Sequence, residues 1–169
     1  MTTYSTANML GANLAQIYTP STDLYPYTGE NPFAVGQVTT GTDGSSWVWV
    51  LALENLAQYD AVAIDESFTA SQATDTEADD SWKFGVASQV AIPAASYGWI
   101  QTRGPTTVFV TGSCAPDVPL FVSATAGAIT DNTTVGTRIK GIVTTTTNSV
   151  TTKAAVAAFM PVEPFFDFA

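Results

Sequence analysis

Trp47-Val48-Trp49-Val50-Leu51-Ala52-Leu53 is the stretch that decides the fold of this 169-residue chain. Successive side chains of a strand point to opposite faces, and here both alternating sets are apolar. Such a pattern is typical of a strand that is buried on both sides. The sequence therefore predicts a central strand over residues 47–53, with other parts of the protein covering each of its faces.

Shorter apolar segments follow this strand, and turn residues separate them at intervals of roughly ten residues. Trp82, Phe84 and Val86 alternate with other residues, which is the pattern of a half-buried strand. Gly104-Pro105 is expected to end the strand that precedes it, because proline cannot donate to a strand ladder. Further strands are expected at residues 61–64, 97–103, 108–110, 120–122, 139–147 and 150–159, the last two as a closing pair.

These segments predict an all-β protein, a single small β-sandwich or barrel of about seven or eight short strands with an extended N-terminal arm. The 27 threonines agree with this fold class, because β-branched side chains suit strands. Lys153–Phe159 contains four alanines and could form a helix instead, since alanine is a poor strand former.

Three parts are expected along the chain: an extended arm at 1–45, a β-domain at 46–160 and an apolar tail at 161–169. The arm lacks sustained periodicity but contains five aromatic residues, more than a disordered segment would carry. The arm is expected to become ordered by packing on a protein surface. Two alternatives stay open, because the arm could lie on a neighbouring molecule or cover the core of its own domain.

The tail holds three phenylalanines in its last five residues, and burying each would contribute roughly 1.5–3 kcal/mol. Two prolines prevent the tail from continuing a regular central strand. We expect it to be covered, either by its own domain or by a neighbour.

Charge and composition exclude several partners. The chain carries 15 acidic and only 5 basic residues, a net charge of −10. Binding to DNA or RNA requires clustered lysine or arginine, and the five basic residues are dispersed. The same acidity disfavours an anionic membrane surface, and no apolar run is long enough to span a bilayer. We therefore expect neither a direct nucleic-acid partner nor a membrane partner.

Few residues of the chain could act in catalysis or bind a metal ion. The chain has no histidine, which removes the commonest general base, the Ser-His-Asp and Cys-His constellations and histidine metal sites. Cys114 is the only cysteine, so it is expected to be a buried structural thiol in a protein made in a reducing compartment. The start of the chain does not resemble a signal peptide.

Carboxylates are the remaining candidates for catalysis or metal binding, and seven of them lie between residues 60 and 80. The segment 75–80 superficially resembles a calcium loop but lacks the central glycine and the final glutamate. A solvated acidic loop is expected there, and no pattern places two carboxylates at a glycosidase spacing. We predict a protein that is not an enzyme, with no catalytic, cofactor or metal site.

The tryptophans could line a sugar-binding face, but Trp47, Trp49 and Trp82 are expected in the core because their neighbours are apolar. Trp99 lies beside Tyr97 and Gln101 and is expected on a surface between subunits. The predicted interface residues are all aromatic and come from the arm, the strand at 97–103 and the tail: Tyr25, Tyr27, Phe33, Tyr97, Trp99, Phe165, Phe166 and Phe168.

Four segments resemble the small head proteins of tailed bacteriophages that decorate, or cement, the capsid. They are WKFGVA at 82–87, YGWIQTRG at 97–104, LFVSATAG at 120–127 and GIV at 141–143. The resemblance covers roughly residues 47–160 and consists of glycine and aromatic placement, without a catalytic signature. It implies a β-rich domain, often trimeric, bound outside the capsid with an arm across neighbouring capsid subunits.

The expected function is therefore that of a non-enzymatic virion structural protein, made in the host cytoplasm, which binds the outer capsid surface and stabilises the head. Its expected partners are the major capsid protein and further copies of itself, as a homotrimer. The alternative is a receptor- or glycan-binding head domain of a phage fibre or surface appendage, which the tryptophan content and the threonine-rich surface would suit.

Overall fold

The structure is a computed structural model, and it describes residues 12–20, 31–134 and 136–167. Within these residues the protein is almost entirely β, which confirms the predicted all-β class. There are more strands than the seven or eight expected, because several have only two or three residues and leave no periodic signal. The thirteen described strands are β1 (Ile17–Tyr18), β2 (Val38–Thr40), β3 (Ser46–Ala52), β4 (Ala61–Ile64), β5 (Thr69–Gln72), β6 (Lys83–Val86), β7 (Tyr97–Val110), β8 (Leu120–Val122), β9 (Ile129–Thr130), β10 (Arg138–Lys140), β11 (Val143–Thr144), β12 (Ala154–Met160) and β13 (Phe165–Asp167).

Five of these strands close into a barrel. β3 pairs with β5 in parallel, and β5 is antiparallel to β4. The ring continues through β6 to β7, and β7 returns to β3 in an antiparallel ladder. Of the two predicted architectures, sandwich or barrel, this half of the molecule is the barrel. Closure removes the free sheet edges that would otherwise invite pairing with another chain.

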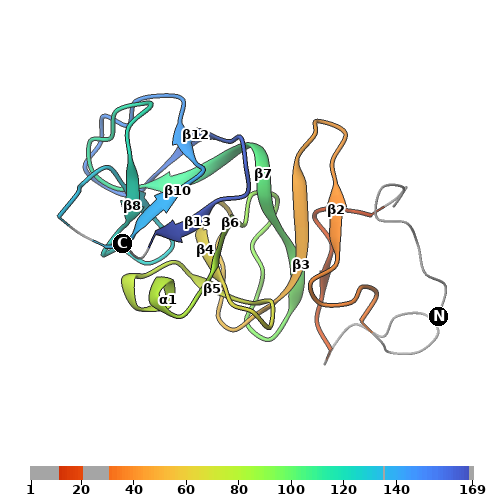
Figure 1. The fold of residues 1–169 in the computed structure, drawn as a ribbon. Helices are drawn as coiled ribbons and strands as arrows, with labels where there is room; N and C mark the ends of the chain where they lie inside the picture. The colour runs from red at the N-terminus through yellow and green to blue at the C-terminus, as the bar shows by residue number, and fades with distance from the viewer. Residues whose placement is uncertain (1–11, 21–30, 135, 168–169) are drawn as a thin grey trace.

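β7 is the longest strand and joins the barrel to a second sheet (Figure 1). Its first half pairs with β3, and its second half, from Gly104 onward, pairs with β12. The expected stop at Gly104-Pro105 is therefore wrong. Gly104 has a φ of +98°, so the strand changes course there without ending, and Pro105 lies where the strand passes between sheets.

The second sheet contains the rest of β7 with β12 and then β11 on one side and β9, β8, β10 and β13 in order on the other. β12 pairs with β7 along its whole length, from Ala154 opposite Val110 to Met160 opposite Gly104. The helical alternative for 153–159 is thus wrong. Val156, Ala158 and Met160 are buried at every second position, so long-range pairing and burial outweigh the helix propensity of alanine.

The core has three parts. Val48, Val50, Ile64 and Ile100 belong to a cluster contributed by the barrel strands and the segments joined to them. A larger cluster lies where the barrel meets the second sheet, where Phe84 and Val86 join residues of β7, β8, β9, β10, β12 and β13. The third cluster is aromatic and covers the outer face of β3 and β7, with Tyr18, Trp47, Trp49 and Trp99. The central strand is thus buried on both faces, as its sequence predicts, but it ends at Ala52. Leu53, which was expected to belong to it, is 58% exposed.

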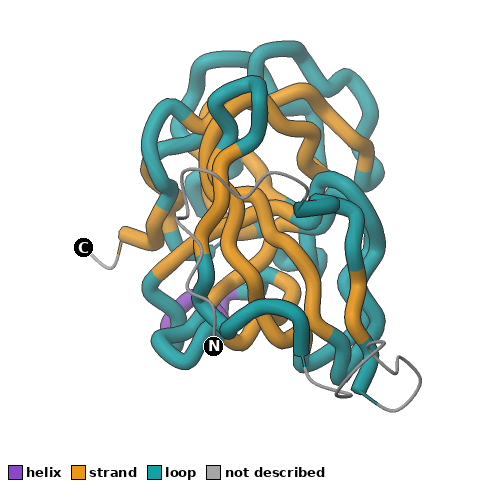
Figure 2. The backbone as a smooth tube through the Cα atoms, turned by 90° about the vertical axis from the view of Figure 1, so that its right-hand side faces the viewer, coloured by secondary structure: helices purple, strands orange, loops and turns teal. Residues whose placement is uncertain are grey.

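The described parts of the predicted arm lie on the chain's own barrel. β1 pairs with the start of β7, and β2 pairs with β3. The tail also returns to its own domain, because β13 pairs with β10 at the end of the second sheet. Figure 2 shows the strands running through the middle of the molecule, with the single described helix, α1 (Asp75–Asp79), near one end.

Candidate functional site

The predicted interface residue Trp99 lies inside its own chain. Only 1% of its surface is exposed, and its ring meets that of Trp49 edge-on with centroids 5.1 Å apart. Trp49 and Trp99 are register partners on β3 and β7, so their side chains share the face that the arm covers. The prediction that Trp99 lies on a surface between subunits is therefore wrong, because the aromatic neighbours that suggested a surface are the core beneath the arm.

Two more predicted interface residues belong to the same aromatic cluster. Phe33 places its ring 5.0 Å from the centroids of both Trp49 and Trp99. Tyr97 stacks on Trp49 at 6.5 Å and is half-buried. These contacts are intramolecular, so they attach the arm to the barrel. Tyr25 and Tyr27, the other predicted arm residues, lie outside the described residues.

The tail divides its phenylalanines between two environments. Phe166 is buried in the core, with its ring 6.0 Å from that of Phe84, so it cannot serve as an interface residue as predicted. Phe165 points the other way along β13 and is 44% exposed, so it remains accessible to a partner. Phe168 lies outside the described residues.

Trp82 is the exposed aromatic residue that sequence reasoning placed in the core. It is 48% exposed, although it stands in phase with the buried residues Phe84 and Val86. β6 begins at Lys83, so Trp82 precedes the strand and the alternation does not govern its side chain. Its ring meets Phe68 edge-on at 6.4 Å, which fixes its direction while leaving much of its surface in water.

Trp82 lies close to the C-terminal segment. The Lys83 ammonium is 5.4 Å from the centroid of the Trp82 ring and forms an ion pair of 3.0 Å with Glu163. The next residue of β6, Phe84, donates its backbone N–H to the carbonyl of Pro164. Two exposed apolar side chains, Val162 at 56% and Phe165, flank this junction. We call Trp82, Val162 and Phe165 the contact surface.

The acidic segment forms a short helix beside a hollow, in place of the loop that the sequence predicts. Residues 75–79 form α1, and Thr74 caps the helix by accepting the N–H of Glu77. The hollow has a volume of about 330 Å³. Its lining combines carboxylates, hydroxyls and two apolar side chains: Leu53, Ala63, Asp65, Glu66, Thr69, Ser71, Glu77, Asp80 and Ser81. We call it the acidic hollow.

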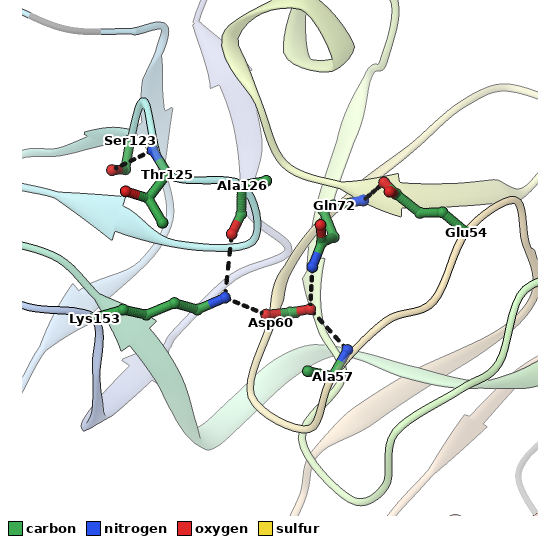
Figure 3. Close-up of polar contacts among 8 residues, drawn as sticks. All are labelled: Glu54, Ala57, Asp60, Gln72, Ser123, Thr125, Ala126 and Lys153. Carbon is green, nitrogen blue, oxygen red and sulfur yellow. Dashed lines mark hydrogen bonds and ion pairs between the residues drawn. The ribbon is translucent and has the colours of Figure 1, made fainter.

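A buried ion pair links the two halves of the fold (Figure 3). Asp60 is fully buried and accepts the Lys153 ammonium at 2.7 Å on Oδ1. Its Oδ2 accepts from the Ala57 N–H at 2.7 Å and from Gln72 Nε2 at 2.6 Å. Both oxygens of the carboxylate therefore accept from donors of the protein itself, which makes Asp60 a structural anchor between the two halves of the fold.

Cys114 is fully buried, as its sequence setting predicts. Burial, with a smaller contribution from the charge of Asp131, raises the pKa of the Cys114 thiol. A raised pKa keeps the thiol protonated and unreactive at neutral pH.

The described ranges contain no group of three or more acidic or cysteine side chains arranged to hold a metal ion. No helix in the described part of the chain is long and apolar enough to cross a membrane. Neither a known protein-family model nor a curated protein sequence matches this chain.

Proposed function

We propose that the chain is a non-enzymatic structural protein of a tailed-bacteriophage particle, which decorates the outer surface of the capsid and stabilises the head. The observation that carries the proposal is the contact surface. Trp82, Val162 and Phe165 leave about half of their surfaces exposed to water. They lie next to the ion pair and the backbone hydrogen bond that join β6 to the C-terminal segment. Exposed apolar and aromatic side chains on adjoining segments are typical of protein–protein contacts.

The charge of the chain supports an outer position. A net charge of −10 disfavours contact with packaged DNA, because phosphate binding requires clustered basic residues. A protein that binds the assembled lattice better than free capsid subunits stabilises that lattice by mass action. The major capsid protein is the proposed partner, and a homotrimer would add multivalent attachment.

Co-sedimentation with expanded capsids that lack the protein tests this function. Wild-type protein should co-sediment and saturate, and the double variant Trp82→Ser/Phe165→Ser should bind at least about tenfold more weakly, because central aromatic residues carry most of an interface's binding energy. Phe159→Ser is the matched control, since Phe159 is also an exposed phenylalanine but lies on β12.

Two results would contradict the proposal. Wild-type protein that fails to co-sediment at saturating concentration would exclude capsid decoration. A double variant that binds as well as the Phe159→Ser control would remove the contact surface from the proposal.

A glycan-binding head domain is the second candidate, and Trp82 is the observation that favours it. Aromatic rings stack on the apolar faces of sugars, and Trp82 is exposed while Trp47, Trp49 and Trp99 are buried. A glycan array that compares wild-type protein with Trp82→Ala separates the candidates. Specific glycan binding that Trp82→Ala abolishes, together with no capsid binding, would favour this function over decoration.

A further inference from the structure

Phe68 has a backbone conformation that bulky residues rarely adopt. Its φ is +58°, in the left-handed region, where a side chain crowds its own backbone. The side chain of Asp65 holds this turn, because its oxygens accept from the N–H groups of Ser67 and Thr69 and from the Thr69 hydroxyl. Strain of this kind persists only where the surrounding structure imposes it, and it concentrates at functional positions.

The Phe68 ring packs on both the barrel and the arm. It lies against the core cluster of the barrel, and the Phe68 carbonyl accepts the N–H of Leu51 on β3. Gly36 of the arm donates its own N–H to the carbonyl of Trp49, two residues earlier on the same strand. A Cβ on Gly36 would lie 2.5 Å from Cε2 of the Phe68 ring, so the ring lies directly against the backbone of the arm.

The same ring supports Trp82 of the contact surface. The rings of Phe68 and Trp82 meet edge-on with centroids 6.4 Å apart. Phe68 stands directly before β5 and Trp82 directly before β6, whereas Gly36 precedes β2. One side chain therefore joins the arm to the contact surface, although the two are far apart in the sequence.

We propose that the arm controls the contact surface through Phe68, which acts as a positioning residue for Trp82. With the arm docked at Gly36, the Phe68 ring holds the exposed indole in the orientation that a partner meets. A side chain that is held before binding loses less conformational entropy on binding, so the docked arm raises the affinity. The inference rests on the proposed function, because it takes the contact surface as the site of attachment.

The indole N–H resonance of Trp82 in ¹⁵N-labelled protein tests the coupling without any capsid. This resonance is assigned by its absence in Trp82→Ala. Gly36→Ala should shift it and lower its ¹H–¹⁵N NOE, because the added methyl group displaces the Phe68 ring. Gly44→Ala is the matched control and should leave the resonance unchanged. Gly44 has a φ of +79°, against +80° for Gly36, but nothing lies within 4 Å of a Cβ there.

Substitutions of Phe68 separate the ring from the backbone strain. Phe68→Ala, Phe68→Leu and Phe68→Tyr all keep a side chain at the left-handed position, but only tyrosine keeps the aromatic ring. Phe68→Ala and Phe68→Leu should lower the NOE of the Trp82 indole, and Phe68→Tyr should preserve the wild-type value. A dispersed spectrum verifies that each variant folds. Phe68→Leu keeps apolar bulk on the barrel core, so it serves where Phe68→Ala does not fold.

Co-sedimentation with capsids that lack the protein measures the effect on attachment. Gly36→Ala and Phe68→Leu should each weaken binding about three- to tenfold, because binding must then order a mobile side chain. Gly44→Ala and Phe68→Tyr should bind as tightly as wild-type protein.

The two measurements distinguish failure of the coupling from failure of the proposed function. An unchanged Trp82 resonance in Gly36→Ala, or an equal change in Gly44→Ala, would overturn the coupling even if wild-type protein binds capsids. A shifted resonance with unchanged capsid affinity would overturn the control of attachment by the arm. Wild-type protein that fails to co-sediment would overturn the proposed function and that control together, while the resonance still reports whether the arm positions Trp82.

Discussion

Lys153 donates to Asp60 across the two halves of the fold, with Nζ 2.7 Å from Oδ1. Asp60 stands directly before β4 of the barrel, and Lys153 stands directly before β12 of the second sheet. The same ammonium also donates to the carbonyl of Ala126 and lies 4.4 Å from the centroid of the Phe109 ring. One lysine thus satisfies a buried charge and covers an aromatic ring between the two sheets.

Lys153→Met should lower the free energy of unfolding by about 3 kcal/mol, because it leaves the buried Asp60 carboxylate without a counter-charge. Urea unfolding followed by tryptophan fluorescence measures the change. Lys140→Met is the control, since it removes the largely exposed ion pair with Asp167 and should cost at most about 1 kcal/mol. Equal losses in both variants would show that Lys153 is no stronger an anchor than a surface lysine.

Gly104→Ala should destabilise the protein more than Gly44→Ala. Both glycines have positive φ, so alanine costs about 1–2 kcal/mol of backbone strain at either position. A Cβ on Gly104 would also lie 2.9 Å from Ser45 Cα, whereas nothing lies within 4 Å of one on Gly44. The difference between the two unfolding free energies should be about 1–3 kcal/mol, and no difference would mean that the close approach at β7 can relax.

Gly104 also separates the part of β7 that the sequence predicts from the part that it does not. The apolar segments on each side of Gly104-Pro105 were predictable, because both carry strand periodicity. Their union into one strand was not, because glycine and proline ordinarily end strands. The pairing of β12 with β7 decides the outcome, and that partner lies about fifty residues away in the chain.

The burial of some aromatic residues was predictable from the local sequence, whereas the burial of others was not. Trp47 and Trp49 were predictable as core because their own segment is apolar on both faces. The burial of Trp99 depends on its register opposite Trp49 and on Phe33 from the arm, neither of which its neighbours in sequence reveal. The acidic hollow was not predictable either, since it brings Leu53 and Asp65 next to α1 through the closure of the barrel.

Trp99→Ala and Trp82→Ala should differ in their cost to the free energy of unfolding, because Trp99 is buried and Trp82 is exposed. Trp99→Ala should cost about 3–5 kcal/mol of unfolding free energy, because it opens a cavity between Trp49 and Phe33. Trp82→Ala should cost about 1 kcal/mol or less, as substitutions at exposed positions do. Chemical denaturation of both variants measures this, and similar costs would contradict the placement of either residue.

Cys114 should make the protein sensitive to alkaline pH. Its folded-state pKa is raised by burial, so the unfolded chain releases the thiol proton first as the pH rises. The resulting stability is complete below the ordinary thiol pKa of about 8.5 and is lost above it. Between pH 8 and 10 wild-type protein should therefore lose more stability than Cys114→Ala. Iodoacetamide should label Cys114 only after unfolding, and rapid labelling of native protein would contradict its burial.

Phe165→Ala and Phe166→Ala should separate the two roles of the tail. The side chains are adjacent in β13 but point to opposite faces. Phe166→Ala should lower the free energy of unfolding by about 3–5 kcal/mol, because it removes the ring that packs on Phe84. Phe165→Ala should change stability by about 0.5 kcal/mol or less and should instead weaken attachment to a partner.

Deleting residues 161–169 would remove all three phenylalanines of the tail and Glu163 together, so it would destabilise the domain and weaken attachment at once. The single substitutions avoid this overlap, because each changes one face of the strand. Thermal unfolding gives the stability of each variant, and capsid co-sedimentation gives its attachment. If Phe165→Ala binds capsids as well as wild type, β13 only completes the second sheet, and the contact surface must be sought at Trp82 and Val162 alone.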